Sequence, residues 1–180
     1  MPQEREICCF WGGGDLNYLE LLSFASMRRA GHPVSLYAYD PPADPPEGVT
    51  LRDAADIMPL DAAPEGLRRD LFRYRLLAAR PDVIWAEPDF AFTQPIRPED
   101  GLLLALQEGG YVSPGVLALP PDSPALQAIL AFTEDPSPVP PWLAQDQRAA
   151  LAALDEPYGP EALGWGVWGA RAENPGLIHK

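Results

Sequence analysis

Two pairs of charged residues have spacings that suit ligand chemistry. Asp70 and Arg73 are three residues apart in the helix-like stretch GLRRDLFRYRLL, so their side chains are neighbours on one helix face. Glu87 and Asp89 follow the apolar run VIWA, and both carboxylates can project from one turn at the strand end. Arginine forks suit phosphate or sugar oxygens, and carboxylates suit Mg²⁺ or Mn²⁺. One hypothesis is therefore a site for a phosphate- or sugar-bearing ligand with a divalent cation.

Each pair also has a purely structural interpretation. Asp70 and Arg73 can form a surface ion pair within one helix, worth a few tenths of a kcal/mol. Glu87 and Asp89 can be solvated turn residues, held stiffly by the intervening Pro88. The sequence leaves the ligand-binding and the structural interpretations open.

Trp11 ends a third stretch of interest, the apolar run ICCFW, and is followed by three glycines. Gly12 and its neighbours allow a ligand to approach the backbone closely, and an indole face can stack on a nucleobase. The alternative is a tryptophan that belongs to the core. The glycine run matches neither of the common phosphate-loop patterns.

The elements around these residues predict an α/β fold. Residues 7–11 form a strand, the glycines a turn, and residues 33–39 a second strand, with a helix between them that Asp15 caps and Gly31 ends. The residues expected on the buried face of this helix are Tyr18, Leu21, Leu22 and Ala25. A strand, helix, strand unit of this kind favours a parallel sheet with right-handed crossovers.

The rest of the chain continues the same alternation. A strong helix ends before Pro81, and its core stripe is expected to be Leu67, Leu71, Tyr74 and Ala78. The expected strands are 83–86, 102–106 and 116–119, and two further helices are expected from Ser123 and over 142–154. We expect one domain, residues 1–180, because this length supports a single sizeable core.

Charge and cysteine content restrict the partners. The chain has 26 acidic and 13 basic residues, a formal net charge of -13, which repels nucleic acid and anionic membranes. No stretch predicts a membrane span. Cys8 and Cys9 are adjacent, so a disulfide between them would be strained, and we expect two reduced, buried thiols in a cytoplasmic protein.

Taken together, several stretches resemble a known group of enzymes. FWGGGDLNYLELLSFASMRRAGHPVSLYAYD, PEGVTLRDAADIMP and RRDLFRYRLLAARPDVIWAEPDF are similar to the sugar-binding-region glycosyltransferases, which include α-1,4-glycosyltransferase-like enzymes, capsular polysaccharide transferases and glucosylating toxins. The resemblance runs from about residue 7 to residue 96, with weaker similarity in GGYVSPGVLALPPDSP and YGPEAL.

The resemblance implies a GT-A type fold with a mostly parallel sheet flanked by helices and a shortened C-terminal part. It implies retaining transfer of a hexose from a nucleotide-diphosphate sugar, expected to be a UDP-sugar, to a glycan or conjugate acceptor, with Mn²⁺ or Mg²⁺ on the diphosphate. Trp11 matches the base-binding position, and Asp70 and Arg73 match the pair that contacts the donor sugar. Asp89 matches the direct metal ligand, and Glu87 the acid that serves the ribose and metal-bound water.

Three hypotheses follow. The leading one is a cytoplasmic glycosyltransferase that builds a bacterial surface glycan or a related conjugate. The second is a non-catalytic nucleotide-sugar-binding or scaffold domain, because Glu87 replaces the family's aspartate and adds a methylene group. The third is an α/β domain in which the acids and tryptophans are only structural.

Overall fold

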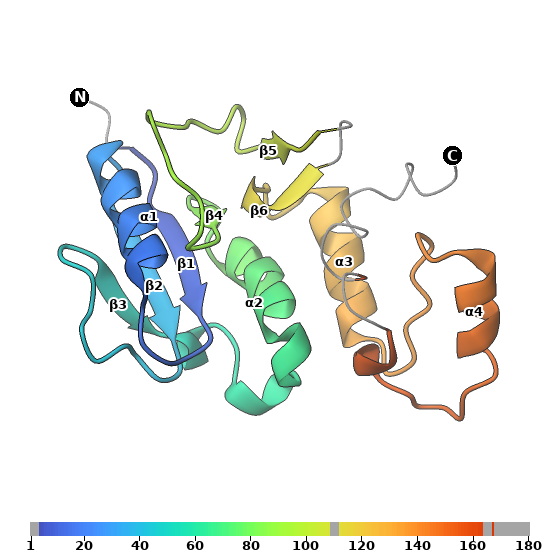
Figure 1. The fold of residues 1–180 in the computed structure, drawn as a ribbon. Helices are drawn as coiled ribbons and strands as arrows, with labels where there is room; N and C mark the ends of the chain where they lie inside the picture. Colours follow the sequence, from blue (N-terminus) through green and yellow to red (C-terminus); the bar gives the residue numbers. More distant parts are fainter. Residues whose placement is uncertain (1–3, 109–111, 164–166, 168–180) are drawn as a thin grey trace.

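A computed structural model describes residues 4–108, 112–163 and 167 and shows a mixed α/β fold with a central sheet of six strands (Figure 1). The strands are β1 (Ile7–Trp11), β2 (Val34–Ala38), β3 (Thr50–Asp53), β4 (Ile84–Ala86), β5 (Leu103–Leu106) and β6 (Val112–Ala118). Their order is β3-β2-β1-β4-β6-β5. The first four are parallel, and β6 is antiparallel to β4 and β5. The predicted α/β architecture is confirmed, with an antiparallel portion at one side.

Helices flank this sheet. They are α1 (Tyr18–Arg29), α2 (Glu65–Ala79), α3 (Pro124–Glu134) and α4 (Gln145–Leu151), with short 3-10 turns at Ala54–Asp56, Leu60–Ala62 and Pro160–Ala162. Helix α2 buries Leu67, Leu71 and Tyr74 of its predicted stripe, whereas Ala78 is half-buried, and Ser123 caps α3 as expected. Helix α4 is shorter than the expected 142–154. Within the described ranges no helix is long and apolar enough to cross a membrane.

Two apolar clusters occupy the two faces of the sheet. Residues of α2 and α3 pack on one face with Cys8 and Phe10, and residues of α1 pack on the other with Ile7 and Cys9. This alternation along β1 is the period of a strand that is buried on both sides. Both cysteines are buried and free, which confirms the two unpaired thiols. Helices α3 and α4 lie on the side of the molecule away from β3 (Figure 1).

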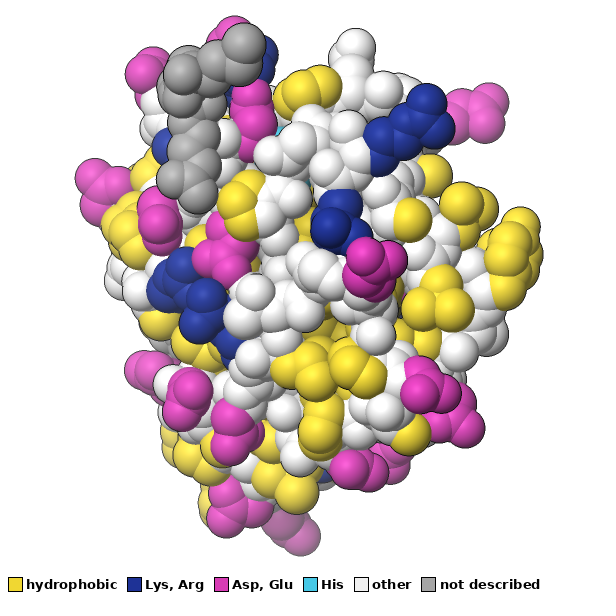
Figure 2. Space-filling model, turned by 90° about the vertical axis from the view of Figure 1, so that its left-hand side faces the viewer, with side chains coloured by type: hydrophobic (Ala, Val, Ile, Leu, Met, Phe, Trp, Pro, Cys, Tyr) yellow, Lys and Arg dark blue, Asp and Glu magenta, His cyan; other side chains and the backbone are white. Residues whose placement is uncertain are grey.

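Helix α1 presents a different face from the expected one. Its N-cap is Asn17, which forms a capping box with Glu20, so the expected cap at Asp15 was wrong. Its buried residues are Ser23, Phe24 and Met27, whereas Tyr18, Leu21 and Leu22 are exposed. Figure 2 shows the side of the molecule on which α1 and β3 lie, and hydrophobic and acidic side chains are interspersed on this surface. The face of α1 that packs inward carries Ser23 and Ser26, whose hydroxyl groups form hydrogen bonds with a neighbouring segment.

That segment, residues 90–96, lies against α1 after the strand end of β4. Ser23 Oγ donates to the carbonyl oxygen of Phe90 (2.6 Å), the Phe92 amide donates to Ser26 Oγ (2.9 Å), and the Ile96 amide donates to His32 Nε2 (3.1 Å). His32 lies in the turn before β2, is buried, and joins the 90–96 segment to the residue stretch before β1. These contacts satisfy backbone groups that the segment, which is not a strand, cannot pair in the sheet.

Candidate functional site

Arg73 is the centre of a buried charge cluster between α2 and the end of β4. Its side chain is 0% exposed, and its Nη2 donates to Asp70 Oδ1 at 2.8 Å, one helical turn away. Its Nη1 lies 3.5 Å from Glu87 Oε1 and 3.5 Å from the carbonyl oxygen of Pro114. The interpretation of Asp70 and Arg73 as a surface pair was wrong, because the sheet covers the arginine.

Glu87 is placed by the sheet. Its amide donates to the carbonyl oxygen of Gly115 at 2.8 Å, next to the β4 and β6 pairing. Its carboxylate lies between two guanidinium groups of α2, Arg73 at 3.5 Å and Arg69 at 3.9 Å. Burial raises the pKa of Glu87, and so do the nearby charges of Asp89 and Asp70, while the two arginines lower it without cancelling the effect.

Sequence reasoning missed Arg69 as a member of this cluster. The available signal was its spacing of four residues from Arg73, which puts both guanidinium groups on one face of the helix. The side chain of Arg69 is 54% exposed, so its pair with Glu87 is at the solvent boundary. The spacing alone does not say that Glu87 packs against this face.

Asp89 lies at the solvent-facing side of the cluster. The residue is exposed, and its charge acts on both Glu87 and Cys9 by raising the pKa of each. The structure thus brings Asp70, Arg73 and Glu87 into direct contact and places Asp89 within electrostatic range of them.

Trp11 and Gly12 lie at the same edge of the sheet. Strands β1 and β4 are parallel, with Cys8 opposite Trp85. Trp11 and Pro88 each follow three residues later, so both lie at the carboxyl ends of these neighbouring strands. Trp11 is half-buried against the apolar cluster on the α1 face of the sheet. Its indole Nε1 donates a hydrogen bond to the carbonyl oxygen of Gly14 at 2.8 Å. A Cβ on Gly12 would meet nothing within 4 Å, so the backbone of this turn is open to a ligand.

The cluster fits a divalent cation only if a ligand completes its coordination. Across residues 4–108 and 112–163, no group of three or more histidine, cysteine, aspartate or glutamate side chains is placed to hold a metal. Both oxygens of Glu87 face arginines, whereas Asp89 is exposed. One or two carboxylates plus substrate phosphates and water is a common way to hold Mg²⁺. A cation at this cluster would therefore need a phosphate ligand in addition to protein carboxylates, and Asp89 is the exposed carboxylate beside it.

Comparisons with known proteins show likeness in structure alone. No protein-family model and no curated protein matches the sequence. Among solved structures 14 chains match, and one of them is described as "PaToxG Glycosyltransferase". It is 10% identical to this chain with a TM-score of 0.46, over 73% of this chain and 60% of its own length. This chain thus spans about three fifths of the length of that protein.

Proposed function

We propose that this protein is a glycosyltransferase that moves a hexose from a nucleotide-diphosphate sugar, with a UDP-sugar as the expected donor, to a glycan or conjugate acceptor. One observation carries the proposal. Arg73 pairs with Asp70 and Glu87 at the edge of the sheet where the exposed Asp89, Trp11 and its open glycine turn also lie. The sequence resemblance assigns donor-binding roles to these same residues.

The contacts of Arg73 differ in strength, and this difference defines its role. The 2.8 Å contact to Asp70 is a short charged hydrogen bond, whereas both Nη1 contacts are 3.5 Å long. Because Arg73 is 0% exposed, a donor oxygen can reach its Nη1 only if Glu87 moves aside, while Asp70 keeps the guanidinium in place. The carboxylate of Asp70, whose side chain is 21% exposed, can then accept a hydrogen bond from a hexose hydroxyl.

The charge of the cluster explains why a cation belongs to the proposal. Three carboxylates, those of Asp70, Glu87 and Asp89, face the two guanidinium groups of Arg69 and Arg73, which leaves one negative charge. This charge opposes the approach of a diphosphate. A Mn²⁺ or Mg²⁺ ion, held by Asp89 and the diphosphate, would supply the positive charge that stabilises the leaving group.

The proposed transfer breaks the bond between hexose C1 and the diphosphate oxygen, and the electron pair stays on the diphosphate. The acceptor hydroxyl oxygen bonds to C1 on the same face, and its proton passes to the departing diphosphate oxygen. The configuration at C1 is then retained without an enzyme nucleophile. The chain's contribution is to orient donor and acceptor, which is a large part of the catalysis of group transfer.

Calorimetry tests this proposal directly. We expect UDP or a UDP-sugar, but not GDP-mannose, to bind in the presence of Mn²⁺ and to lose affinity in its absence. Asp89→Ala should abolish the metal-dependent binding, whereas Asp82→Ala, at the opposite end of β4, should not change it. Absence of binding for every nucleotide would leave only the structural interpretation.

A scaffold that binds the donor without transfer is the second candidate. The observation in its favour is that Glu87 is bound between two arginines rather than facing the ligand side. Release of free sugar from the bound donor separates the two functions. Slow hydrolysis supports the transferase, and tight binding without turnover over hours supports the scaffold.

A further inference from the structure

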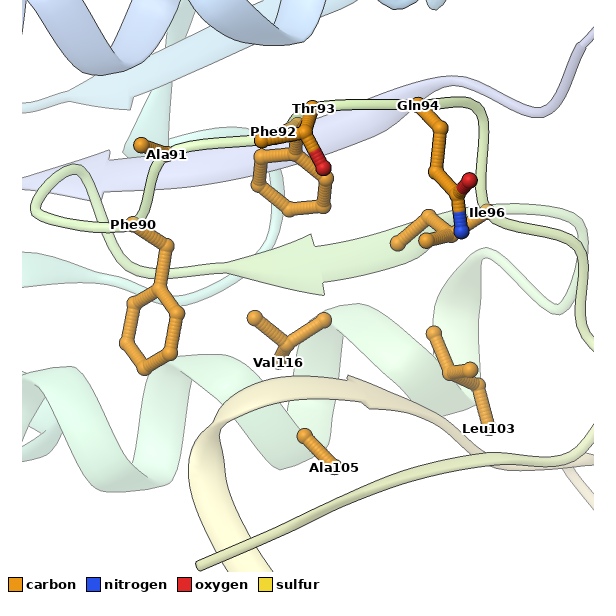
Figure 3. Close-up of a pocket in the computed structure, with 9 residues that line it drawn as sticks. All are labelled: Phe90, Ala91, Phe92, Thr93, Gln94, Ile96, Leu103, Ala105 and Val116. Atoms are coloured by element: carbon orange, nitrogen blue, oxygen red, sulfur yellow. The ribbon is translucent and has the colours of Figure 1, made fainter.

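An apolar hollow of about 280 Å³ lies next to the charge cluster, between the 90–96 segment and strands β5 and β6. Figure 3 shows side chains from all three elements around it. Its apolar lining consists of Phe90, Ala91, Phe92, Ile96, Leu103, Ala105 and Val116. Thr93 and Gln94 add one hydroxyl and one amide group, and none of the described residues that line it is charged.

The walls of this hollow are held in place by the fold. The three hydrogen bonds to Ser23, Ser26 and His32 fix the backbone of the 90–96 segment against α1. On the other side, the ring of Phe90 packs so closely on β6 that a Cβ at Gly115 would overlap with it. The hollow is therefore pre-formed, which lowers the entropy cost of binding.

The hollow adjoins the charge cluster at Phe90, although its lining residues pack on the α1 face of the sheet and Arg73 lies on α2, which covers the other face. Phe90 lines the hollow and directly follows Asp89, and Gly115, on which its ring lies, accepts the amide hydrogen bond of Glu87. The two sites have opposite chemistry. The cluster consists of charged groups, whereas the hollow is uncharged in a chain whose net charge is -13. A diphosphate that brings a divalent cation suits the first, and a neutral apolar group suits the second.

We propose that this hollow is an acceptor subsite that takes an apolar aglycone, an aryl or short alkyl group joined to the acceptor sugar. The inference rests on the proposed glycosyltransferase function, because the acceptor hydroxyl must lie near the donor held at Asp89. The size agrees with this occupant, since a buried apolar cavity of about 150 Å³ can hold benzene. Thr93 and Gln94 provide polar partners for a sugar hydroxyl.

The test compares phenyl β-D-glucoside with methyl β-D-glucoside, which differ only in the aglycone. We expect the phenyl compound to bind about tenfold more tightly, because the open hollow buries only part of the ring. In methyl NMR spectra, it should shift the signals of Ile96 and Val116. Ala105→Phe fills the hollow and should remove the tenfold preference. The matched control Ala150→Phe, which partly fills a separate apolar hollow beside α4, should keep it.

Donor binding, measured by calorimetry with UDP and Mn²⁺ on the same proteins, separates the two proposals. Equal affinity for both glucosides, unshifted Ile96 and Val116 methyl signals, or an Ala105→Phe variant that keeps the preference would overturn the subsite, whatever the donor result. Loss of UDP binding in all forms, with the phenyl preference intact, would instead overturn the transferase and leave the hollow as an apolar binding site. Unchanged UDP binding in Ala105→Phe, with the preference lost, supports both.

Discussion

Arg73→Met tests whether the buried charge cluster stabilises the fold. The wild-type guanidinium is 0% exposed and lies 2.8 Å from Asp70 and 3.5 Å from Glu87. Its removal leaves two carboxylates close together without their shared partner. Breaking a buried ion pair in this way costs about 3–5 kcal/mol. We expect the lower end, because each carboxylate side chain is about one fifth exposed and Glu87 keeps Arg69.

Urea unfolding, followed by circular dichroism, measures this loss as a change in the free energy of unfolding. The double variant Arg73→Met/Glu87→Gln should be more stable than Arg73→Met, because one of the two carboxylates that lost Arg73 is neutral. We expect a coupling energy of about 1–2 kcal/mol between the two positions. Arg75→Met, on the same helix but partly exposed, is the control and should cost less than about 1 kcal/mol.

Two results would refute the reasoning. A loss below about 1 kcal/mol in Arg73→Met would mean that solvent screens the cluster as it screens a surface pair. Strict additivity of Arg73→Met and Glu87→Gln would mean that the 3.5 Å contact carries no energy.

Four further predictions concern pH, packing and thiol chemistry. Burial alone would raise the pKa of Glu6, but hydrogen bonds from Ser35 and Arg80 outweigh burial and lower this pKa. The contribution of the Glu6 carboxylate to the free energy of unfolding is therefore full above pH 4.5, and it is lost as pH falls through the lowered pKa. Urea unfolding from pH 7 to pH 3 should show this loss, and Glu6→Gln should flatten it. The pH dependence expected for Glu87 is opposite, because its pKa is raised. The free energy of unfolding of the wild type should therefore increase relative to that of Glu87→Gln as pH falls from 7 toward 5. A relative decrease would contradict the raised pKa of Glu87. Gly115→Ala should destabilise the fold by about 1–3 kcal/mol, because the new methyl group overlaps with the Phe90 ring, and Phe90→Leu in the same chain should recover part of the loss. Burial raises the pKa of the Cys8 thiol to about 12, so neither cysteine should react with a thiol reagent at pH 8 until the chain unfolds; rapid reaction of the native protein would disprove this.

Local periodicity was enough to predict most of the elements. Helix α2 was predicted from Leu67, Leu71 and Tyr74 because their spacing repeats with the helix period, and the structure buries all three. The apolar runs that became β1, β2 and β4 were recognisable because strands buried on both faces have few polar residues. In α1 the same reasoning chose the wrong face. Its leucines are exposed, since Ser23 and Ser26 form their hydrogen bonds to a segment more than 60 residues later.

The adjacency of Asp70 and Arg73 was determined by the sequence alone, because residues three apart in a helix must be neighbours. Their burial, the attachment of Glu87 to Arg69, and the hollow beside Asp89 were decided only by tertiary structure. Each depends on contacts between segments that are distant in the chain, here α2 with the end of β4 and the 90–96 segment with β5 and β6. Side-chain types and spacings specify which groups are available, and the packing of the sheet decides which of them meet and how much water they retain.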